Sequence, residues 1–239
     1  MSTARLAVDA APGRARVDLS AGAGTTLVPR LIGRTSSTVR VALVAGGALV
    51  LGGDTIGLDV RVGAGCTLDL TEVGGTVAYD ADGEASFWRT SVVVEAGATL
   101  IWRGLETVVA DGANLRRRTT ITLADGARAL VREVCVLGRS GERGGRLLVE
   151  TEVSIDGTPL LVESVDVRGD QPMPGVLGPH RVFESMLLAG VRPGGVPDVH
   201  SMQLAGRGAL ARYLGASVHE SPLEPTWNTW RGLLNQVES

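Results

Sequence analysis

The amino-acid sequence predicts an all-β protein, a β-helix or solenoid-like stack of short strands with a small C-terminal hairpin and helix. Three observations predict this fold. Aliphatic and polar residues alternate with a period of two, as they do over residues 56–62. Glycine turns separate the alternating runs, and 33 of the 239 residues are glycine. These turns also recur at a regular spacing.

The opening segment already shows this alternation of apolar and polar residues between turns. Residues 15–19 and 39–44 alternate between apolar and polar positions, and Pro12 and Gly13 interrupt the chain before them. Short alternating runs bounded by turn residues are typical of strands. We therefore expect the chain to begin with strands.

Residues 46–70 show the scheme most clearly. Glycine pairs at 46–47 and 52–53 enclose an apolar run and lead to the carboxylate of Asp54. The alternation over residues 56–62 follows, and a glycine turn then starts the scheme again. Asp54 is open to two interpretations, a functional carboxylate or a turn residue that accepts backbone N–H groups.

A glycine followed by a small residue and then an aliphatic residue recurs along the body. The spacings are 18, 32, 15, 14 and 31 residues for Gly47, Gly65, Gly97, Gly112, Gly126 and Gly157. Most are near 15 or twice 15, which favours a coiled chain that stacks each strand-and-turn unit on the last. A β-sandwich, with turns at intervals of ~8–12 residues, is the alternative. Inward aliphatic rows are expected from Val92 and Val94, Ile121 and Leu123, Val131, Val134 and Val136, and Leu147 and Val149.

The regular pattern of alternating strands and glycine turns ends near residue 168. We therefore divide a single domain, residues 1–239, into a β-helical body (1–168) and a C-terminal hairpin and helix (169–239). Residues 169–179 hold three prolines and three glycines and predict a loop. Residues 181–190 fit a helical turn or a strand equally well, whereas 199–204 and 209–214 predict a hairpin.

The last segment predicts an amphipathic helix. Thr226 follows Pro225 and is expected to cap it. One apolar face combines Trp227, Trp230, Leu233, Leu234 and Val237. We expect its tryptophans to pack on the domain rather than to face a partner.

Composition excludes several classes of function. All 23 basic residues are arginine, so a Walker A phosphate loop and a lysine Schiff base are excluded. Only 3% of residues are aromatic, which argues against base-stacking platforms and hence against nucleic acid as a partner. The basic run at 116–118 is interpreted as a solvated strand edge in preference to a phosphate site.

The expected setting is the cytoplasm, without membrane contact. No apolar run approaches the ~18 residues of a membrane span, and no apolar leader is present at the N-terminus. Cys66 and Cys135 have no metal-ligand spacing and are expected to be reduced.

Catalytic constellations are sparse. His180, His200 and His219 have no spacing that a metal site would use, and no nucleophile elbow or dinucleotide fingerprint occurs. Isolated carboxylates in a β-protein are mostly turn or surface residues. Residue patterns alone indicate an all-β domain without visible catalytic machinery.

Five segments, in order, nevertheless resemble the UreD (UreH) family of urease accessory proteins. The glycine pairs leading to Asp54 are the first, and Gly65 to Thr71 is the second. The others are Gly97 to Trp102, Glu106 to Ala113, and the pair formed by Leu137-Gly138-Arg139 and Asp156 to Glu163. The resemblance covers residues 40–165 well and the remainder weakly. It departs from the family pattern after Thr71.

The resemblance implies a non-enzymatic scaffold that docks on the urease structural subunits together with a UreF-like helical protein and a UreG-like GTPase. It implies a β-helical body that conducts Ni²⁺ to the urease active site, with no tightly bound cofactor. By motif, Asp54 and Glu163, and more weakly Glu142, are the carboxylates expected to line the conduit. A conduit must release its ion, so isolated carboxylates suit it better than His or Cys cages.

Two alternatives from other classes remain open at this point. One is a β-helical carbohydrate-active enzyme, which would bring two carboxylates to ~5–9.5 Å in a groove. The scarcity of aromatic residues argues against a sugar groove. The other is a plain protein-interaction module without a metal role.

Overall fold

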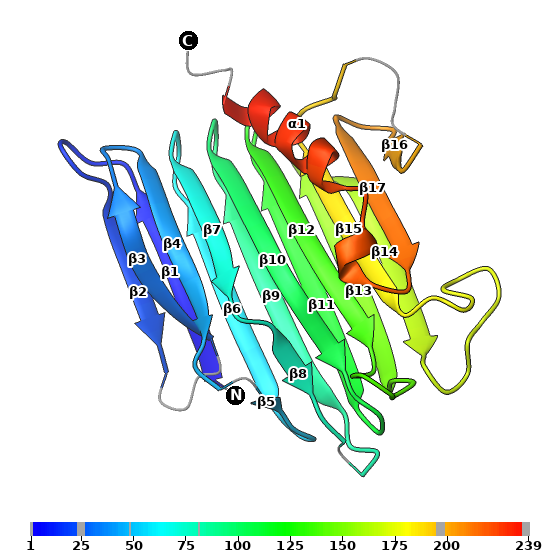
Figure 1. The fold of residues 1–239 in the computed structure, drawn as a ribbon. Coiled ribbons are helices and arrows are strands. Elements are labelled where there is room, and N and C mark those ends of the chain that lie inside the picture. The colour runs from blue at the N-terminus through cyan, green and yellow to red at the C-terminus, as the bar shows by residue number, and fades with distance from the viewer. Residues whose placement is uncertain (1, 23–26, 48, 81, 195–198, 236–239) are drawn as a thin grey trace.

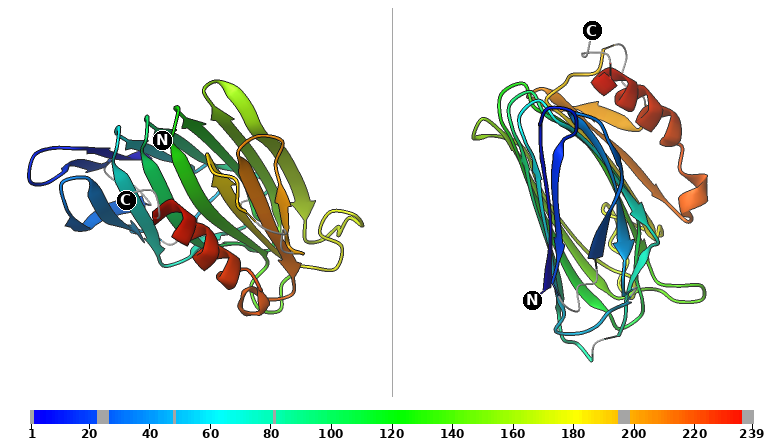
Figure 2. Two further views of the ribbon diagram at one scale, coloured as in Figure 1. Left: turned by 90° about the horizontal axis from the view of Figure 1, so that it is seen from above. Right: turned by 90° about the vertical axis from the view of Figure 1, so that its left-hand side faces the viewer.

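A computed structural model describes residues 2–22, 27–47, 49–80, 82–194 and 199–235. It confirms the all-β, solenoid-like fold: two sheets face each other, and helix α1 (Glu224–Asn235) lies on the outside of one of them (Figures 1 and 2). The alternation of apolar and polar positions gives each strand one face that can be buried between the sheets. The core therefore lies between the two sheets.

We name the two sheets A and B. Sheet A has seven strands in the spatial order β14, β13, β11, β9, β6, β1, β2. Their bounds are β1 (Ser2–Asp9), β2 (Arg16–Ala21), β6 (Thr55–Val62), β9 (Ser86–Val94), β11 (Asn114–Leu123), β13 (Arg146–Ile155) and β14 (Thr158–Arg168).

Sheet B has ten strands, eight of them in the order β16, β17, β15, β12, β10, β7, β4, β3. Their bounds are β3 (Leu27–Arg34), β4 (Thr38–Ala45), β7 (Thr67–Val73), β10 (Thr99–Val109), β12 (Arg128–Leu137), β15 (Val182–Ala189), β16 (Ser201–Gln203) and β17 (Gly208–Gly215). The short strands β5 (Leu49–Val50) and β8 (Thr76–Ala78) pair with each other, and β8 also pairs with β10.

The central strands form a flattened coil, because successive strands alternate between the sheets. The chain crosses from β6 to β7, from β9 to β10 and from β11 to β12 through matching turns, and the neighbouring strands within each sheet run parallel. Gly65, Gly97 and Gly126 occupy these turns at φ of 66°, 65° and 67°, a conformation that favours glycine. The Gly65 N–H donates to the Ala96 carbonyl at 3.0 Å, so each turn rests on the next. The predicted unit of about 15 residues is half of one coil.

The inward rows are largely as expected. Val92, Ile121 and Leu147 lie in the buried core between the sheets. The row assigned to β12 is wrong in part, because residues 131 and 134 differ by an odd number and must point to opposite faces. Val131 packs against the core, whereas Val134, in register with Glu184, lies on the outer face of sheet B, as does Val136, which has the same parity.

The C-terminal segment completes sheet B and then covers it. Residues 182–189 form strand β15, antiparallel to β12, which resolves the ambiguity over 181–190 in favour of a strand. Strands β16 and β17 form the predicted hairpin. A short 3₁₀ helix, η1 (Val218–Glu220), leads to α1.

Helix α1 packs its tryptophans as predicted. Trp227 and Trp230 are buried against Ile101, Leu130 and Met186 on the outer face of sheet B. In the side view of Figure 2, α1 covers this face only.

The predicted cap of α1 is wrong. The helix begins at Glu224, so Thr226 lies within its first turn. Val237, the last residue of the predicted apolar face, lies outside the described residues. Among the helices in the described part of the chain, none is long and apolar enough to cross a bilayer.

Candidate functional site

A row of polar side chains crosses the inner face of sheet A, transverse to the strands. Thr90, Thr119, Thr151 and Glu163 are register partners on β9, β11, β13 and β14. Thr90 and Thr119 are buried. Glu163 thus lies at the edge of the sheet, at the end of a row of hydroxyl groups.

A matching row crosses the inner face of sheet B. Glu133, Ser185 and Arg212 are register partners on β12, β15 and β17. Glu72 on β7 lies farther along the same sheet, beside the irregularity in β10 between Arg103 and Glu106. We call the following nine residues the polar layer: Thr90, Arg117, Thr119, Thr151 and Glu163 of sheet A, and Glu72, Glu133, Ser185 and Arg212 of sheet B.

Glu163 and Arg212 join the two rows at the edge. The guanidinium donates from Nη1 to Oε1 and from Nη2 to Oε2, both at 2.7 Å, which is the bidentate geometry preferred by this pair. The same guanidinium lies over the Phe183 ring, 4.8 Å from its centroid. The sequence-predicted residue Glu163 is therefore inside the fold and paired.

Deeper in the layer, Arg117 and Glu133 make a second contact between the sheets. Their Nε and Oε1 atoms are 2.6 Å apart. Arg117 also donates to Thr107 Oγ1 at 2.7 Å and lies over the Trp88 ring at 4.5 Å. Burial opposes the charge on Arg117, but the neighbouring acidic groups, Glu133 first, outweigh it and raise its pKa. Arg117 therefore stays charged in the interior.

The interpretation of residues 116–118 as a solvated strand edge is therefore wrong. Strand β11 has β9 on one side and β13 on the other, so it is a central strand. Arg116 and Arg118 are exposed on the outer face of sheet A. Arg117 points inward because it has the opposite parity.

Glu72 is held differently: among the described residues, no arginine forms an ion pair with it. Its carboxylate accepts the indole N–H of Trp102 at 3.1 Å and the backbone N–H of Leu105 at 2.9 Å. Burial raises its pKa, and the charge of Arg117 together with these two hydrogen bonds only partly opposes that shift. Burial therefore favours the protonated form of Glu72.

A cavity of about 40 Å³ lies within the layer. A water molecule needs roughly 10–15 Å³ of such space, so there is room for about three waters. Polar and charged groups at the cavity suit bound water: Arg117, Thr119, Glu133, Thr151, Glu163 and Ser185. Cys135 is buried nearby, and burial raises the pKa of its thiol to about 12, so the thiol is protonated at neutral pH.

Asp54 lies elsewhere, in a surface turn. Its Oδ2 accepts the Leu51 N–H at 2.8 Å, and the residue is exposed. Strands β9, β11 and β13 stand between β6, which follows Asp54, and β14, which carries Glu163. Four steps of ~4.8 Å between strands put the two carboxylates about 19 Å apart across the sheet. The structure does not bring them together.

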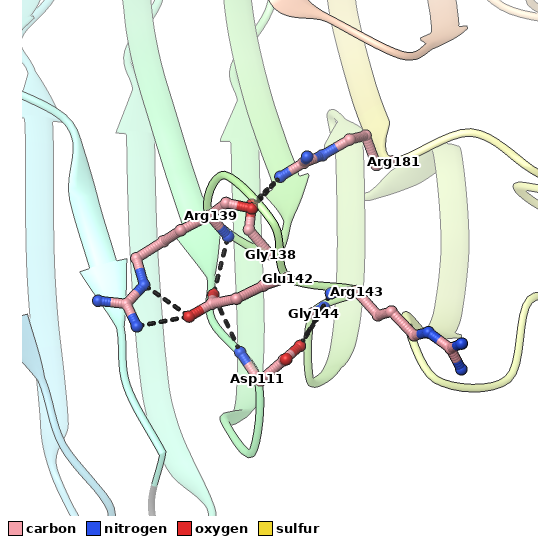
Figure 3. Close-up of polar contacts among 7 residues, drawn as sticks. All are labelled: Asp111, Gly138, Arg139, Glu142, Arg143, Gly144 and Arg181. Atoms are coloured by element: carbon pink, nitrogen blue, oxygen red, sulfur yellow. Dashed lines mark hydrogen bonds and ion pairs between the residues drawn. The ribbon is translucent and has the colours of Figure 1, made fainter.

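Glu142 organises a loop at the end of β12 (Figure 3). One carboxylate oxygen accepts the Arg139 N–H at 2.9 Å and the Asp111 N–H at 3.3 Å, and the other pairs with the Arg139 guanidinium. These hydrogen bonds, with Arg139 the largest contributor, lower the pKa of Glu142 to about 2. Both of its oxygens are engaged in closing the loop.

The same loop is tied down from two further sides. Asp111 Oδ1 accepts the N–H groups of Arg143 at 3.0 Å and Gly144 at 2.6 Å. Arg181 donates to the carbonyls of Gly138 and Arg139 (Figure 3). Asp111, Glu142 and Arg181 therefore come from three segments and together hold this loop in place.

Among the described residues, no group of three or more His, Cys, Asp and Glu side chains is placed to hold a metal ion. The charged groups of the interior are instead distributed along the layer and, apart from Glu72, paired with each other. Such an arrangement can present polar atoms and water in sequence from the edge inward. It does not form a cage.

Fold and interior together define a solenoid-like β-protein whose sheets enclose a charged layer. The chain matches the family model of the UreD urease accessory protein over residues 2–238, and it belongs to that family. This is a family of accessory proteins rather than of catalysts.

Individual relatives agree with the family match. The chain is 44% identical over 212 residues to urease accessory protein UreD 1 of Streptomyces griseus subsp. griseus, a match that covers 87% of this chain and 83% of the relative. It is 36% identical over 227 residues to UreD 1 of Saccharopolyspora erythraea, covering 90% and 89% of the two chains. A UreD of Streptomyces avermitilis is 32% identical over 212 residues, covering 82% and 83%.

Sequence reasoning missed most of the polar layer. Glu133 carries a readable signal, since it interrupts an inward row between Val131 and Cys135 on β12. Arg117 carries a similar one on β11, between Leu115 and Thr119. Arg212 carries none, because its partner Glu163 is 49 residues away in the sequence and on the other sheet.

Proposed function

We propose that this chain is a scaffold for urease maturation that passes Ni²⁺ along its polar layer toward the urease active site. It docks on the urease structural subunits together with a UreF-like helical protein and a UreG-like GTPase, in the cytoplasm. Membership of the urease accessory family supports the maturation role. Ni²⁺ is cargo here and not a resident cofactor.

The observation that carries the nickel route is the charged layer inside an otherwise apolar core. Removing ions from water is costly, and a buried ion pair often stabilises a protein no better than apolar side chains of similar volume would. Stability alone therefore does not call for Arg117 and Glu133 between the sheets. A polar layer with room for a few waters does serve an ion that must cross the fold.

The chemistry of the layer suits transfer rather than storage. Carboxylate, hydroxyl and water oxygens bind Ni²⁺ more weakly than thiolates or imidazoles do. Glu133 and Glu163 already have guanidinium partners, and these compete with any cation that arrives. Weak sites in series allow an ion to enter and also to leave.

Of the three carboxylates expected from the sequence, the proposal keeps Glu163 as a ligand. Asp54 and Glu142 are assigned structural roles, since their oxygens close a turn and a loop. Glu72 and Glu133 replace Asp54 and Glu142 as the other carboxylates of the proposed route.

The test replaces the inner ion pair with apolar residues of similar size. A strain that lacks its own UreD-like protein is complemented with the double variant Arg117→Met and Glu133→Leu. The matched control is Arg118→Met with Glu152→Leu, which removes an exposed pair whose Nη2 and Oε1 atoms are 2.7 Å apart. Urease nickel content and urease activity are measured, with co-purification of the urease subunits as the docking readout.

The inner double variant should still co-purify with urease, while nickel content and activity fall by roughly 10–100-fold, as after loss of metal-site partners. The outer double variant should load nickel normally. Normal loading by the inner variant would remove the route and leave an interaction module. Failure of the wild-type chain to co-purify with urease would remove the scaffold role.

A further inference from the structure

The ion pair at the edge of the polar layer differs from the inner one in its access to solvent. The side chains of Glu163 and Arg212 are 24% and 22% exposed, against 13% and 6% for Glu133 and Arg117. A cation that approaches from solution at this edge therefore meets Glu163 first. Both of its oxygens are occupied by Arg212.

The strand that carries Glu163 is held on one side only. Strand β14 is the edge of sheet A and pairs with β13. Opposite it, β17 pairs with β15 along its length and with the short strand β16 over Ser201–Gln203. The Glu163–Arg212 contact thus joins the edge strand of sheet A to the second strand of sheet B.

The Arg212 guanidinium makes a second favourable contact besides its pair with Glu163. Its guanidinium lies 4.8 Å from the centroid of the Phe183 ring, and cation–π contact with that ring does not depend on Glu163. Its Nε has no hydrogen-bond partner among the described residues. The guanidinium can therefore leave the carboxylate while keeping a favourable contact.

We infer that Arg212 gates the polar layer: its guanidinium occupies the Glu163 carboxylate, and a divalent cation enters only when that guanidinium releases the carboxylate while keeping its contact with Phe183. This inference rests on the proposed nickel route and names Arg212 as the residue that controls entry to it. The exchange is charge-driven, since a dication replaces a monocation on the same two oxygens. In the isolated chain the gate is closed.

The experiment measures Ni²⁺ binding to the purified full chain by isothermal titration with nickel chloride, without urease. The variants are Arg212→Gln, the double variant Arg212→Gln with Glu163→Gln, and Arg212→Lys. Lysine keeps the charge but loses the planar fork that matches a carboxylate, so the variant tests geometry in a chain that retains an ion pair. Thermal unfolding of each variant verifies that it folds.

Arg212→Gln should bind Ni²⁺ about fivefold tighter than the wild type, the equivalent of ~1 kcal/mol of released competition. Arg212→Lys should fall between the two, and adding Glu163→Gln should abolish the gain. The matched control is Arg146→Gln, which frees Asp166 from a bidentate pair on the neighbouring strands β13 and β14.

Equal Ni²⁺ affinity in Arg212→Gln and the wild type would overturn the gate, as would an equal gain in Arg146→Gln. If Arg212→Gln does not fold, equal affinity in Arg212→Lys and the wild type overturns it. The outcome is separable from the proposed function, because binding is measured on the chain alone and transfer is measured as nickel in urease.

Discussion

Arg231 of helix α1 and Asp69 of strand β7 are 162 residues apart in the sequence, and their Nη2 and Oδ2 atoms are 2.7 Å apart. A second pair, Arg103 with Glu224, ties the first turn of the helix to β10. Both pairs are at least partly exposed. They position the helix, while its own buried tryptophans, Trp227 and Trp230, supply most of the stabilisation.

Replacing Trp227 should therefore cost far more than breaking an ion pair. Trp227 is 1% exposed, and we expect Trp227→Ala to lower the free energy of unfolding by ~3–5 kcal/mol. Arg231→Gln should lower it by no more than ~1 kcal/mol. Denaturant unfolding of the two variants measures the difference, and similar losses would contradict this division of roles.

Removing one partner of the Arg117–Glu133 pair should destabilise the fold far more than replacing both partners with apolar residues. Glu133→Leu alone leaves the charge of Arg117 buried without its carboxylate, which we expect to lower the free energy of unfolding by ~3–5 kcal/mol. Adding Arg117→Met should recover most of that loss. A double-mutant cycle in denaturant measures the coupling, and additive losses would show that the two side chains act independently.

Glu142 should stabilise the fold in a pH-dependent way. Its pKa is about 2 in the folded chain, against an ordinary 4.5. The stabilisation is then fully present above pH 4.5 and is lost as the pH falls toward 2. Unfolding curves of Glu142→Gln and the wild type should differ at neutral pH and converge across this window. A gap that persists at pH 2 would show that the loop does not depend on the ionised carboxylate.

Glu72 should show the opposite dependence. Burial raises its pKa above the ordinary 4.5, so the ionised form is penalised in the folded chain. That penalty is absent below pH 4.5 and grows as the pH rises. The stability of Glu72→Gln relative to the wild type should accordingly increase between pH 4 and pH 8, as thermal unfolding would measure. A flat or falling difference would contradict the raised pKa.

The layout of the fold was accessible from the sequence because it rests on local signals. The alternation over residues 56–62 became strand β6, and the glycines at 65, 97 and 126 became the stacked turns between the sheets. Each of these signals acts within a few residues.

The interior chemistry was less accessible because it depends on pairing between distant segments. Glu163 was expected to line the interior, but its bond to Arg212 follows only from the facing of β14 and β17. The position of Glu72 depends on the irregularity in β10, where the Leu105 N–H turns toward it. Asp54 carries the same glycine-flanked motif whether it serves chemistry or a turn, so only its contact with Leu51 decides between them.

The one-sided placement of helix α1 has a consequence during synthesis. Ile101, Leu130 and Met186 leave the ribosome well before residues 224–235 do, and in the finished fold that helix covers them. Until then a growing chain exposes these apolar side chains on the outer face of a nearly complete sheet B. The interval before the helix emerges is therefore when a nascent molecule is most prone to aggregate.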